Sequence, residues 1–301
     1  MQDIEITEIP PLSPGEQSLL DFHSVVNVIN VLNCELIVLG LNAADNDQYL
    51  STGLAWCDRV VASLQDRDQA LEQARQVEAM ERAVLDEIDA KLCHRPAPGP
   101  EMAETMANIR SVFEILKVRA RELLARAATP ERWEEFDVAQ LRQNFSDVFA
   151  AIERNSHWRY RILYNAARQQ PGDYYVDLKI EAGDEKRLVM PPVLQDVMRD
   201  LIANARKYTA PGGHITAALY ADAAELRFVV RDDGKGIPPE EIRQVVAFGK
   251  RASNVGNVRT MGGGCGLTKA FLVTKQFGGR FWIASELGHG TQVRLWLPRP
   301  C

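Results

Sequence analysis

The first half of this 301-residue chain has very few glycines, and the whole chain lacks an excess of basic residues. Four of the 20 glycines lie in residues 1–171 and 16 lie in residues 172–301, which indicates a domain boundary near Pro171. The net charge of −6 suggests no basic stripe of the kind that binds nucleic acid, so we expect no nucleic-acid partner. Five cysteines without a CxxC pair indicate reduced thiols rather than disulfides or a zinc site.

Neither a signal peptide nor a membrane-spanning helix is evident in the sequence. Its most apolar stretch, residues 25–41, contains four residues that are costly inside lipid: Asn27, Asn30, Asn33 and Glu35. Charged residues at 25% and hydrophobic residues at 46% are typical of a soluble protein. We therefore expect a cytoplasmic protein with no membrane span.

Apolar residues at alternating steps of three and four predict helices in the first half of the chain. Residues 1–14 contain three prolines and are predicted to be an irregular lead-in, and residues 15–170 are predicted to form a dimeric helical bundle. Helices are predicted over about residues 15–41, 48–92, 101–127 and 130–167. The second of these would extend about 65 Å, so it is predicted to be an antiparallel hairpin arm or a coiled coil. The helices between residues 45 and 127 are predicted to form this arm or an input module.

Residues 172–301 have a different pattern, in which strand-like runs alternate with helices and glycine loops. Strands are predicted over residues 174–180, 214–220, 225–231, 280–285 and 291–297. Helices are predicted over residues 192–208, 239–248 and 267–277. This order is typical of an α/β sandwich, so the whole chain is predicted to be an α+β protein.

Three clusters in the second half contain residues typical of a ligand site. In the first, Asp200, Asn204, Lys207 and Tyr208 are spaced so that they share one face of a helix. Taken alone, an ordinary amphipathic surface helix explains this spacing equally well.

The second cluster contains Asp232, Gly234 and Gly236 at the end of a predicted strand. Glycines at a strand end let the backbone approach a ligand closely, and the aspartate can accept a hydrogen bond from an exocyclic amine. An everyday Asp-Gly turn is the alternative.

The third cluster contains Gly262, Gly264, Gly266 and Leu267, directly before a predicted helix. Serial glycines there expose backbone N–H groups, and the helix dipole favours an anion such as phosphate. No Gly-Lys-Ser/Thr follows, so the loop is not a Walker motif.

In this order, the clusters resemble the nucleotide-binding boxes of the histidine kinase ATP-binding domain, which shares a superfamily with gyrase, Hsp90 and MutL. The resemblance covers roughly residues 172–301 and implies ATP and Mg²⁺ as cofactors. It implies that Asn204 holds Mg²⁺ and that Asp232 binds the adenine amine. Lys207 and Tyr208 occupy the positions that meet phosphate and adenine.

Further residues match the same boxes. Phe248 and Arg251 resemble the phenylalanine box, and residues 249–261 would be the ATP lid. The closing Gly-x-Gly-Thr motif ends at Thr291. Asp200 is a second candidate metal ligand, although related hydrolases have a water-activating glutamate there.

A histidine kinase also needs a histidine on a helical hairpin before the ATP domain. His23 is predicted to be this phosphoacceptor because it lies with Asn27 and Asn30 opposite the apolar seam of its helix. Asn27 matches the position that orients water for dephosphorylating the partner regulator. Ser24 replaces the carboxylate that usually follows the histidine as general base, which predicts weak kinase activity or a dominant phosphatase direction. The other histidines are His94, His157, His214 and His289.

The resemblance implies a two-component histidine kinase, a homodimeric phosphoprotein that transfers phosphate from His23 to a response-regulator receiver domain. Two alternatives stay open. Ser24 favours a phosphotransfer or phosphatase scaffold with a regulatory ATP domain, and Asp200 favours a gyrase-like ATP hydrolase. The sequence identifies neither the signal nor the regulator, and it leaves transfer in cis or in trans undecided.

Overall fold

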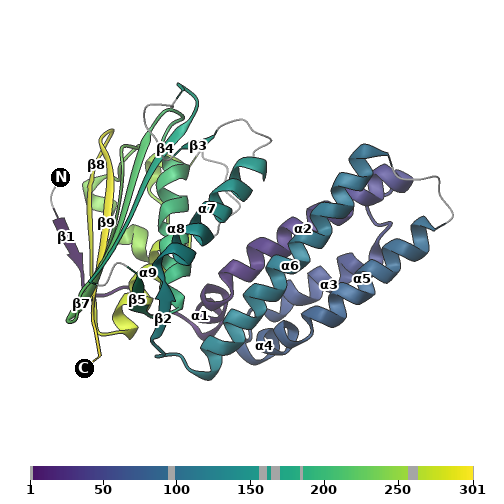
Figure 1. Ribbon diagram of the computed structural model, residues 1–301, viewed down its shortest axis with the longest axis horizontal. Coiled ribbons are helices and arrows are strands. Elements are labelled where there is room, and N and C mark those ends of the chain that lie inside the picture. The colour runs from purple at the N-terminus through teal and green to yellow at the C-terminus, as the bar shows by residue number, and fades with distance from the viewer. Residues whose placement is uncertain are drawn as a thin grey trace. The chain divides into compact units, whose positions relative to one another are not determined.

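The protein is described by a computed structural model that covers residues 3–93, 99–155, 161–163, 170–183, 186–256 and 264–300. The chain forms two compact units (Figure 1). The helical unit comprises residues 12–130, and the sheet unit comprises residues 1–11 together with residues 131–301. The predicted boundary near Pro171 is therefore wrong, because the sheet unit resumes at Glu131.

The helical unit contains α1 (Pro14–Asp21), α2 (His23–Ala44), α3 (Ser51–Ser63), α4 (Arg67–Arg75), α5 (Val77–Leu92) and α6 (Pro100–Ala128). Four of them pack side by side as an antiparallel bundle, in which α2 contacts α3 and α6, and α5 contacts the same two helices (Figure 1). The continuous helix predicted over residues 48–92 is instead divided into α3, α4 and α5, and α3 packs against α5 as in the predicted hairpin. Asp66 ends that run because its carboxylate accepts hydrogen bonds from the N–H groups of Asp68 and Gln69, which starts α4 as a new helix.

The helix predicted over residues 15–41 is interrupted at Phe22, which separates α1 from α2. Its predicted apolar seam is confirmed, since Phe22, Val25, Ile29, Leu32, Leu36 and Leu39 are all buried. Among the described residues, α2 is also the one helix that is long and apolar enough to cross a membrane by length and composition. One third of its most apolar window (33%) is buried against the rest of the protein.

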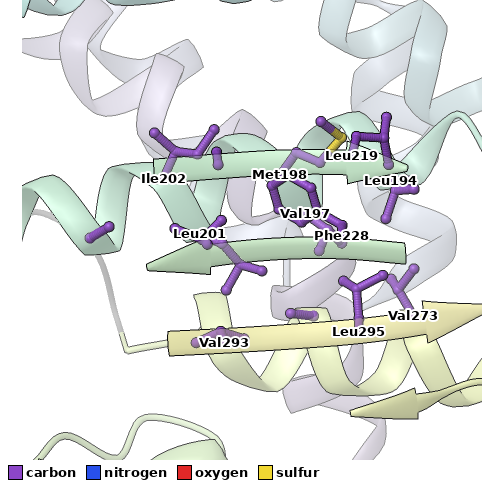
Figure 2. Close-up of a cluster of buried hydrophobic side chains, with 14 of the residues drawn as sticks. Leu194, Val197, Met198, Leu201, Ile202, Leu219, Phe228, Val273, Val293 and Leu295 are labelled. Atoms are coloured by element: carbon purple, nitrogen blue, oxygen red, sulfur yellow. The ribbon is translucent and has the colours of Figure 1, made fainter. Parts of the chain in front are cut away.

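The sheet unit is built on seven strands in the order β1-β8-β9-β7-β6-β4-β3. These strands are β1 (Asp3–Ile6), β3 (Ile162–Leu163), β4 (Tyr174–Ala182), β6 (His214–Ala221), β7 (Glu225–Asp232), β8 (Arg280–Glu286) and β9 (Gly290–Pro298). β6 and β7 alternate between buried and exposed residues, so one face of the sheet is covered. The helices α8 (Val193–Tyr208) and α9 (Gly266–Gln276) cover that face, and apolar side chains from both layers interdigitate between them (Figure 2).

The α+β prediction is confirmed, as are the five predicted strands and the helices over residues 192–208 and 267–277. Two other predictions are wrong. Residues 130–167 begin with β2 (Glu134–Asp137), which pairs with β5 (Arg187–Met190), and only then form α7 (Val138–Asn155). Residues 239–248 form two short 3₁₀ turns instead of an α-helix.

Residues 3–6 form a strand within the segment predicted to be an irregular lead-in. β1 pairs antiparallel with β8 at one edge of the sheet (Figure 1), and Ile6 is buried there. The Glu5 carboxylate accepts two hydrogen bonds from the Arg280 guanidinium at 2.9 and 2.6 Å. The three prolines of this segment all follow the strand, so they do not interrupt it.

Candidate functional site

The helix α8 carries the first predicted cluster on its partly exposed side. Val197, Leu201 and Ile202 are buried against the sheet (Figure 2), as the amphipathic pattern predicts. Asp200, Asn204, Lys207 and Tyr208 are only half-buried. The packing of the apolar face thus leaves these four side chains at the surface of the helical layer.

Gly266, the last glycine of the third predicted cluster, lies directly against Asn204. A Cβ atom at Gly266, the first residue of α9, would lie 2.6 Å from the Asn204 Nδ2, so a larger residue there would displace the Asn204 side chain. The N–H groups of the first turn of α9, which have no acceptor within the helix, therefore lie next to the Asn204 amide. Gly264 precedes this start, and Leu267 packs on the sheet core. Gly262 and residues 257–261 of the predicted lid lie outside the described residues.

Asp232 is buried at the end of β7 and uses one carboxylate oxygen to hold two loops together. Its Oδ1 accepts hydrogen bonds from the N–H groups of Gly234 at 2.9 Å and Thr291 at 3.2 Å. Among the described residues, its Oδ2 accepts no hydrogen bond. Burial raises the pKa of this carboxyl group to about 6, with the nearby Asp233 adding to the shift and the two N–H groups opposing it.

The Asp232 loop also contacts the end of α8. The N–H of Lys235 donates to the carbonyl oxygen of Tyr208 at 3.1 Å. Gly236 adopts a φ of 67°, and a Cβ atom there would collide with the carbonyl of Glu286. The first and second predicted clusters are therefore neighbours in the folded chain.

Positive charge gathers around the end of α8. Burial, followed by the charges of Arg251 and Arg206, lowers the pKa of Lys207 to about 8. The Lys207 Nζ lies 5.2 Å from the centre of the Tyr208 ring, and burial raises the pKa of that phenol. Arg251 is exposed, and Phe248 is half-buried shortly before it. This concentration of positive charge suits a phosphate ligand.

Asp200 has a buried partner that the sequence analysis missed. Lys269 on α9 places its Nζ 3.1 Å from the Asp200 Oδ2 and 3.9 Å from the Asp196 Oδ2. The only signal in the sequence is a lysine within the apolar run that follows Leu267. No group of three or more His, Cys, Asp or Glu side chains suited to a metal ion occurs in the part of the chain that the structure describes.

His23 is the first residue of α2 and contacts Asn27, as predicted from their shared face. The Asn27 Nδ2 lies 3.5 Å from the His23 Nε2. Ser24 is half-buried, and its Oγ is buried without a hydrogen-bond partner among the described residues. His214 and His289 are exposed in the sheet unit, whereas His94 and His157 lie outside the described residues.

Comparison with known proteins finds a family model that matches the C-terminal part of the chain. Residues 189–300 match the family described as histidine kinase-, DNA gyrase B- and HSP90-like ATPase. This segment resembles an ATPase domain of that family. Asn204, Asp232 and the N-terminus of α9 all lie within it.

The relatives include proteins named as sensory kinases. The chain is 27% identical over 252 residues to the adaptive-response sensory kinase SasA of Synechococcus elongatus, which covers 79% of this chain and 61% of SasA. It is 33% identical over 129 residues to the histidine protein kinase DivJ of Caulobacter vibrioides, which covers 39% of this chain and 21% of DivJ. The chain thus spans less than two thirds of the length of these relatives.

Two solved structures also align with the chain. The catalytic domain of the histidine kinase ThkA is 18% identical, with 56% of this chain and 97% of that chain covered and a TM-score of 0.37. The mycobacterial sensor histidine kinase MprB is 21% identical, with 56% and 100% covered and a TM-score of 0.37.

Proposed function

We propose that this chain is a two-component histidine kinase that phosphorylates His23 from Mg-ATP and passes the phosphoryl group to a response-regulator aspartate. The observation that carries the proposal is the contact between Asn204 and the N-terminus of α9 through Gly266. It brings an amide side chain together with backbone N–H groups that have no acceptor within their helix, in a segment that resembles an ATPase domain.

The residues present fit ATP and Mg²⁺. The absence of a Cβ at Gly266 leaves room beside the Asn204 amide, whose oxygen is a suitable ligand for a hard cation. Mg²⁺ held by Asn204 would supply positive charge that neutralises the phosphates. Lys207 and Arg251 would bind the phosphates, and the Oδ2 of Asp232 would accept the adenine amine.

The chemical step takes place at the His23 imidazole. Its neutral ring nitrogen forms a bond to the γ-phosphorus while the bond to the bridging oxygen of ADP breaks, and ADP leaves with that electron pair. A receiver-domain aspartate then attacks the same phosphorus and regenerates the imidazole. Asn27, which contacts His23, would orient water when the phosphorylated regulator is hydrolysed.

We propose that the protein is a cytoplasmic homodimer without a membrane span, and that a receiver domain is its partner. In α2, the buried side chains of Leu32, Leu36 and Leu39 pack within the helical unit, which supports a water-soluble role for this apolar helix. The polar residues Asn27, Asn30 and Asn33 on the same helix support it as well.

A phosphotransfer or phosphatase scaffold is the second candidate, and Ser24 favours it. The buried Oγ of Ser24 has no partner among the described residues, so Ser24 does not serve His23 as a hydrogen-bonded base. A gyrase-like hydrolase is supported less, because the Lys269 ammonium occupies the Oδ2 of Asp200 that would have to activate water.

Incubation with γ-labelled ATP and Mg²⁺ tests the proposal. We expect an acid-labile, alkali-stable label that is lost in His23→Ala and in Asn204→Ala. His214→Ala is the control, because this exposed histidine lies outside the proposed site and its variant should be labelled like the wild type. A label that survives in His23→Ala would contradict the phosphoacceptor assignment. Phosphate release without label would favour the hydrolase, and neither product would favour the scaffold.

A further inference from the structure

We infer that Lys269 suppresses ATP hydrolysis by holding the Asp200 carboxylate in a buried ion pair, so that the γ-phosphoryl group passes to histidine instead of water. Lys269 is thus a positioning residue that acts through Asp200. The inference rests on the proposed function. Both residues lie in the sheet unit, together with Asn204 and the start of α9.

Asp200 lies beside the proposed phosphate site. It precedes Asn204 by one turn of α8, and the Asn204 amide in turn lies against Gly266 at the start of α9. The Asp200 charge also reaches Cys265, the residue before that start: burial raises the pKa of this thiol, and Asp200 adds to the shift. A carboxylate beside bound phosphates can take the proton of an attacking water, which is general base catalysis.

Hydrolysis would compete with transfer to His23 for the same phosphorus. In hydrolysis the oxygen of water forms a bond to the γ-phosphorus, the bond to the bridging oxygen of ADP breaks, and ADP leaves with that electron pair. The proton of the attacking water passes to a carboxylate oxygen and then to solvent. A carboxylate that serves as the base must therefore become neutral during this step.

Lys269 opposes that neutral state of Asp200. Its Nζ lies 3.1 Å from the Asp200 Oδ2, and its side chain is only 4% exposed. A lysine buried to this extent is rarely found without a paired charge. Whichever oxygen of Asp200 took the proton, the buried ammonium would lose its closest counter-charge, which is strongly unfavourable. The ion pair therefore keeps Asp200 from activating water.

The second carboxylate near Lys269 has a cation of its own. The Asp196 Oδ2 is farther from the Lys269 Nζ, at 3.9 Å, and the Asp196 Oδ1 accepts a hydrogen bond from Arg199. Asp196 would keep this partner if the ammonium were removed. Asp200 would then be freed, since its Oδ2 bonds Lys269 and its Oδ1 accepts no hydrogen bond in the part of the chain that the structure describes.

Phosphate release from a chain without the phosphoacceptor tests the inference. His23→Ala is the background, so that phosphate arises from direct attack of water on ATP and not from a phosphohistidine. Lys269→Met is added, and phosphate release at saturating Mg-ATP is measured per folded chain. We expect an increase of at least about tenfold, because a positioned general base contributes about 10²–10⁴-fold. Further addition of Asp200→Asn should remove this increase.

Three more variants in the same background serve as controls. Lys179→Met removes an exposed lysine that pairs with Asp177, and it should leave phosphate release unchanged. Lys269→Arg retains a cation and should release no more phosphate than the background. Lys269→Gln is a second neutral variant, and its amide can still donate to Asp200, which helps to preserve the fold if Lys269→Met is unstable. The folded fraction is measured by circular dichroism, so a loss of stability alone does not raise the release per folded chain.

Two outcomes would overturn the inference. Unchanged release per folded chain in the neutral variants of Lys269 would leave this residue with a structural role only. An increase that persists after Asp200→Asn would mean that another group activates the water. A wild type that takes up no label from γ-labelled ATP contradicts the proposed function itself, whereas a labelled wild type with unchanged release in the variants contradicts only the role of Lys269.

Discussion

Lys269 and Asp200 form an ion pair that joins α9 to α8, with 3.1 Å between the Nζ and the Oδ2. The Lys269 side chain is only 4% exposed. Asp200 lies one turn before Asn204 on α8, and Lys269 lies one turn after the start of α9 at Gly266. The ion pair therefore holds together the two helices that meet at the proposed phosphate site.

Lys269→Met should destabilise the protein strongly. It leaves Asp200 and the buried Asp196 without the shared ammonium, and the loss of one partner from a buried pair costs about 3–5 kcal/mol. We expect a lower free energy of unfolding in urea at pH 7, partly restored when Asp200→Asn is added. The control is Lys179→Met, which removes an exposed ion pair with Asp177 and should cost less than about 1 kcal/mol. Equal losses in the two single variants would contradict the structural role of Lys269.

The acid limit of nucleotide binding should follow the titration of Asp232. Its pKa of about 6 means that the carboxyl group becomes protonated as the pH falls through 6, and the oxygen that would accept the adenine amine then carries a proton. We expect ATP affinity to fall by up to tenfold per pH unit below about 6. In Asp232→Asn, ATP affinity should be low at every pH, and the decrease below about pH 6 should be absent. Calorimetric titration between pH 5 and pH 7.5 measures both, and a decrease that persists in the variant would exclude Asp232.

The ionised Asp232 carboxylate should also lower the free energy of unfolding when no nucleotide is bound. Its pKa is raised above the value in the unfolded chain, so the folded state loses stability as the pH rises from about 4 through 6. Asp232→Asn removes this charge, while its amide oxygen can still accept the N–H groups of Gly234 and Thr291. We expect the variant to gain on the order of 1 kcal/mol at pH 7 and nothing at pH 4. Thermal unfolding at both pH values checks this, and a loss at pH 7 would contradict it.

The parts of the fold that sequence patterns predicted are those with strong local periodicity. α8 was predictable because Val197, Leu201 and Ile202 recur at helical spacing. β1 was not, because it has only four residues and its partner Arg280 is 275 positions from Glu5. A strand so short depends on tertiary pairing more than on its own pattern.

Features of the site and the bundle that depend on tertiary contacts could not be predicted from sequence patterns either. The pattern of α2 shows which face is apolar, but it does not show that α3 and α5 of the same chain cover the bundle core. Lys269 was missed because a buried lysine resembles an interruption of an apolar run, and its partner Asp200 is 69 positions away. The cluster motifs were predictable because their residues are close in sequence.

Gly266→Ala should impair nucleotide binding more than folding. The added Cβ would lie 2.6 Å from the Asn204 Nδ2, so the Asn204 side chain must move away from the start of α9. We expect ATP affinity in the presence of Mg²⁺ to fall at least about tenfold, the effect of displacing one charge-assisted contact. Gly172→Ala is the matched control, because no atom lies within 4 Å of its Cβ and it lies outside the proposed site. Equal affinities of both variants and the wild type would show that Asn204 does not contribute to binding.

The alkaline limit of binding should depend on Lys207. Its pKa of about 8 means that the ammonium loses its proton as the pH rises through 8, so its attraction for phosphate weakens. We expect ATP affinity to fall above about pH 8, by up to tenfold per pH unit. The Lys207→Met variant should bind ATP weakly at every pH and should show no decrease in affinity above about pH 8.

A substitution of Arg251 tests whether Lys207 causes the decrease in ATP affinity at high pH. The Arg251 charge lowers the pKa of Lys207, so Arg251→Gln should raise that pKa and move the alkaline midpoint to higher pH. Arg251 is itself a proposed phosphate ligand, so overall affinity should fall at the same time. Arg206→Gln, which removes the weaker of the two neighbouring charges, should move the midpoint in the same direction by less. Affinity measured between pH 7 and pH 10 gives all three midpoints, and an unmoved midpoint in Arg251→Gln would mean that another group titrates there.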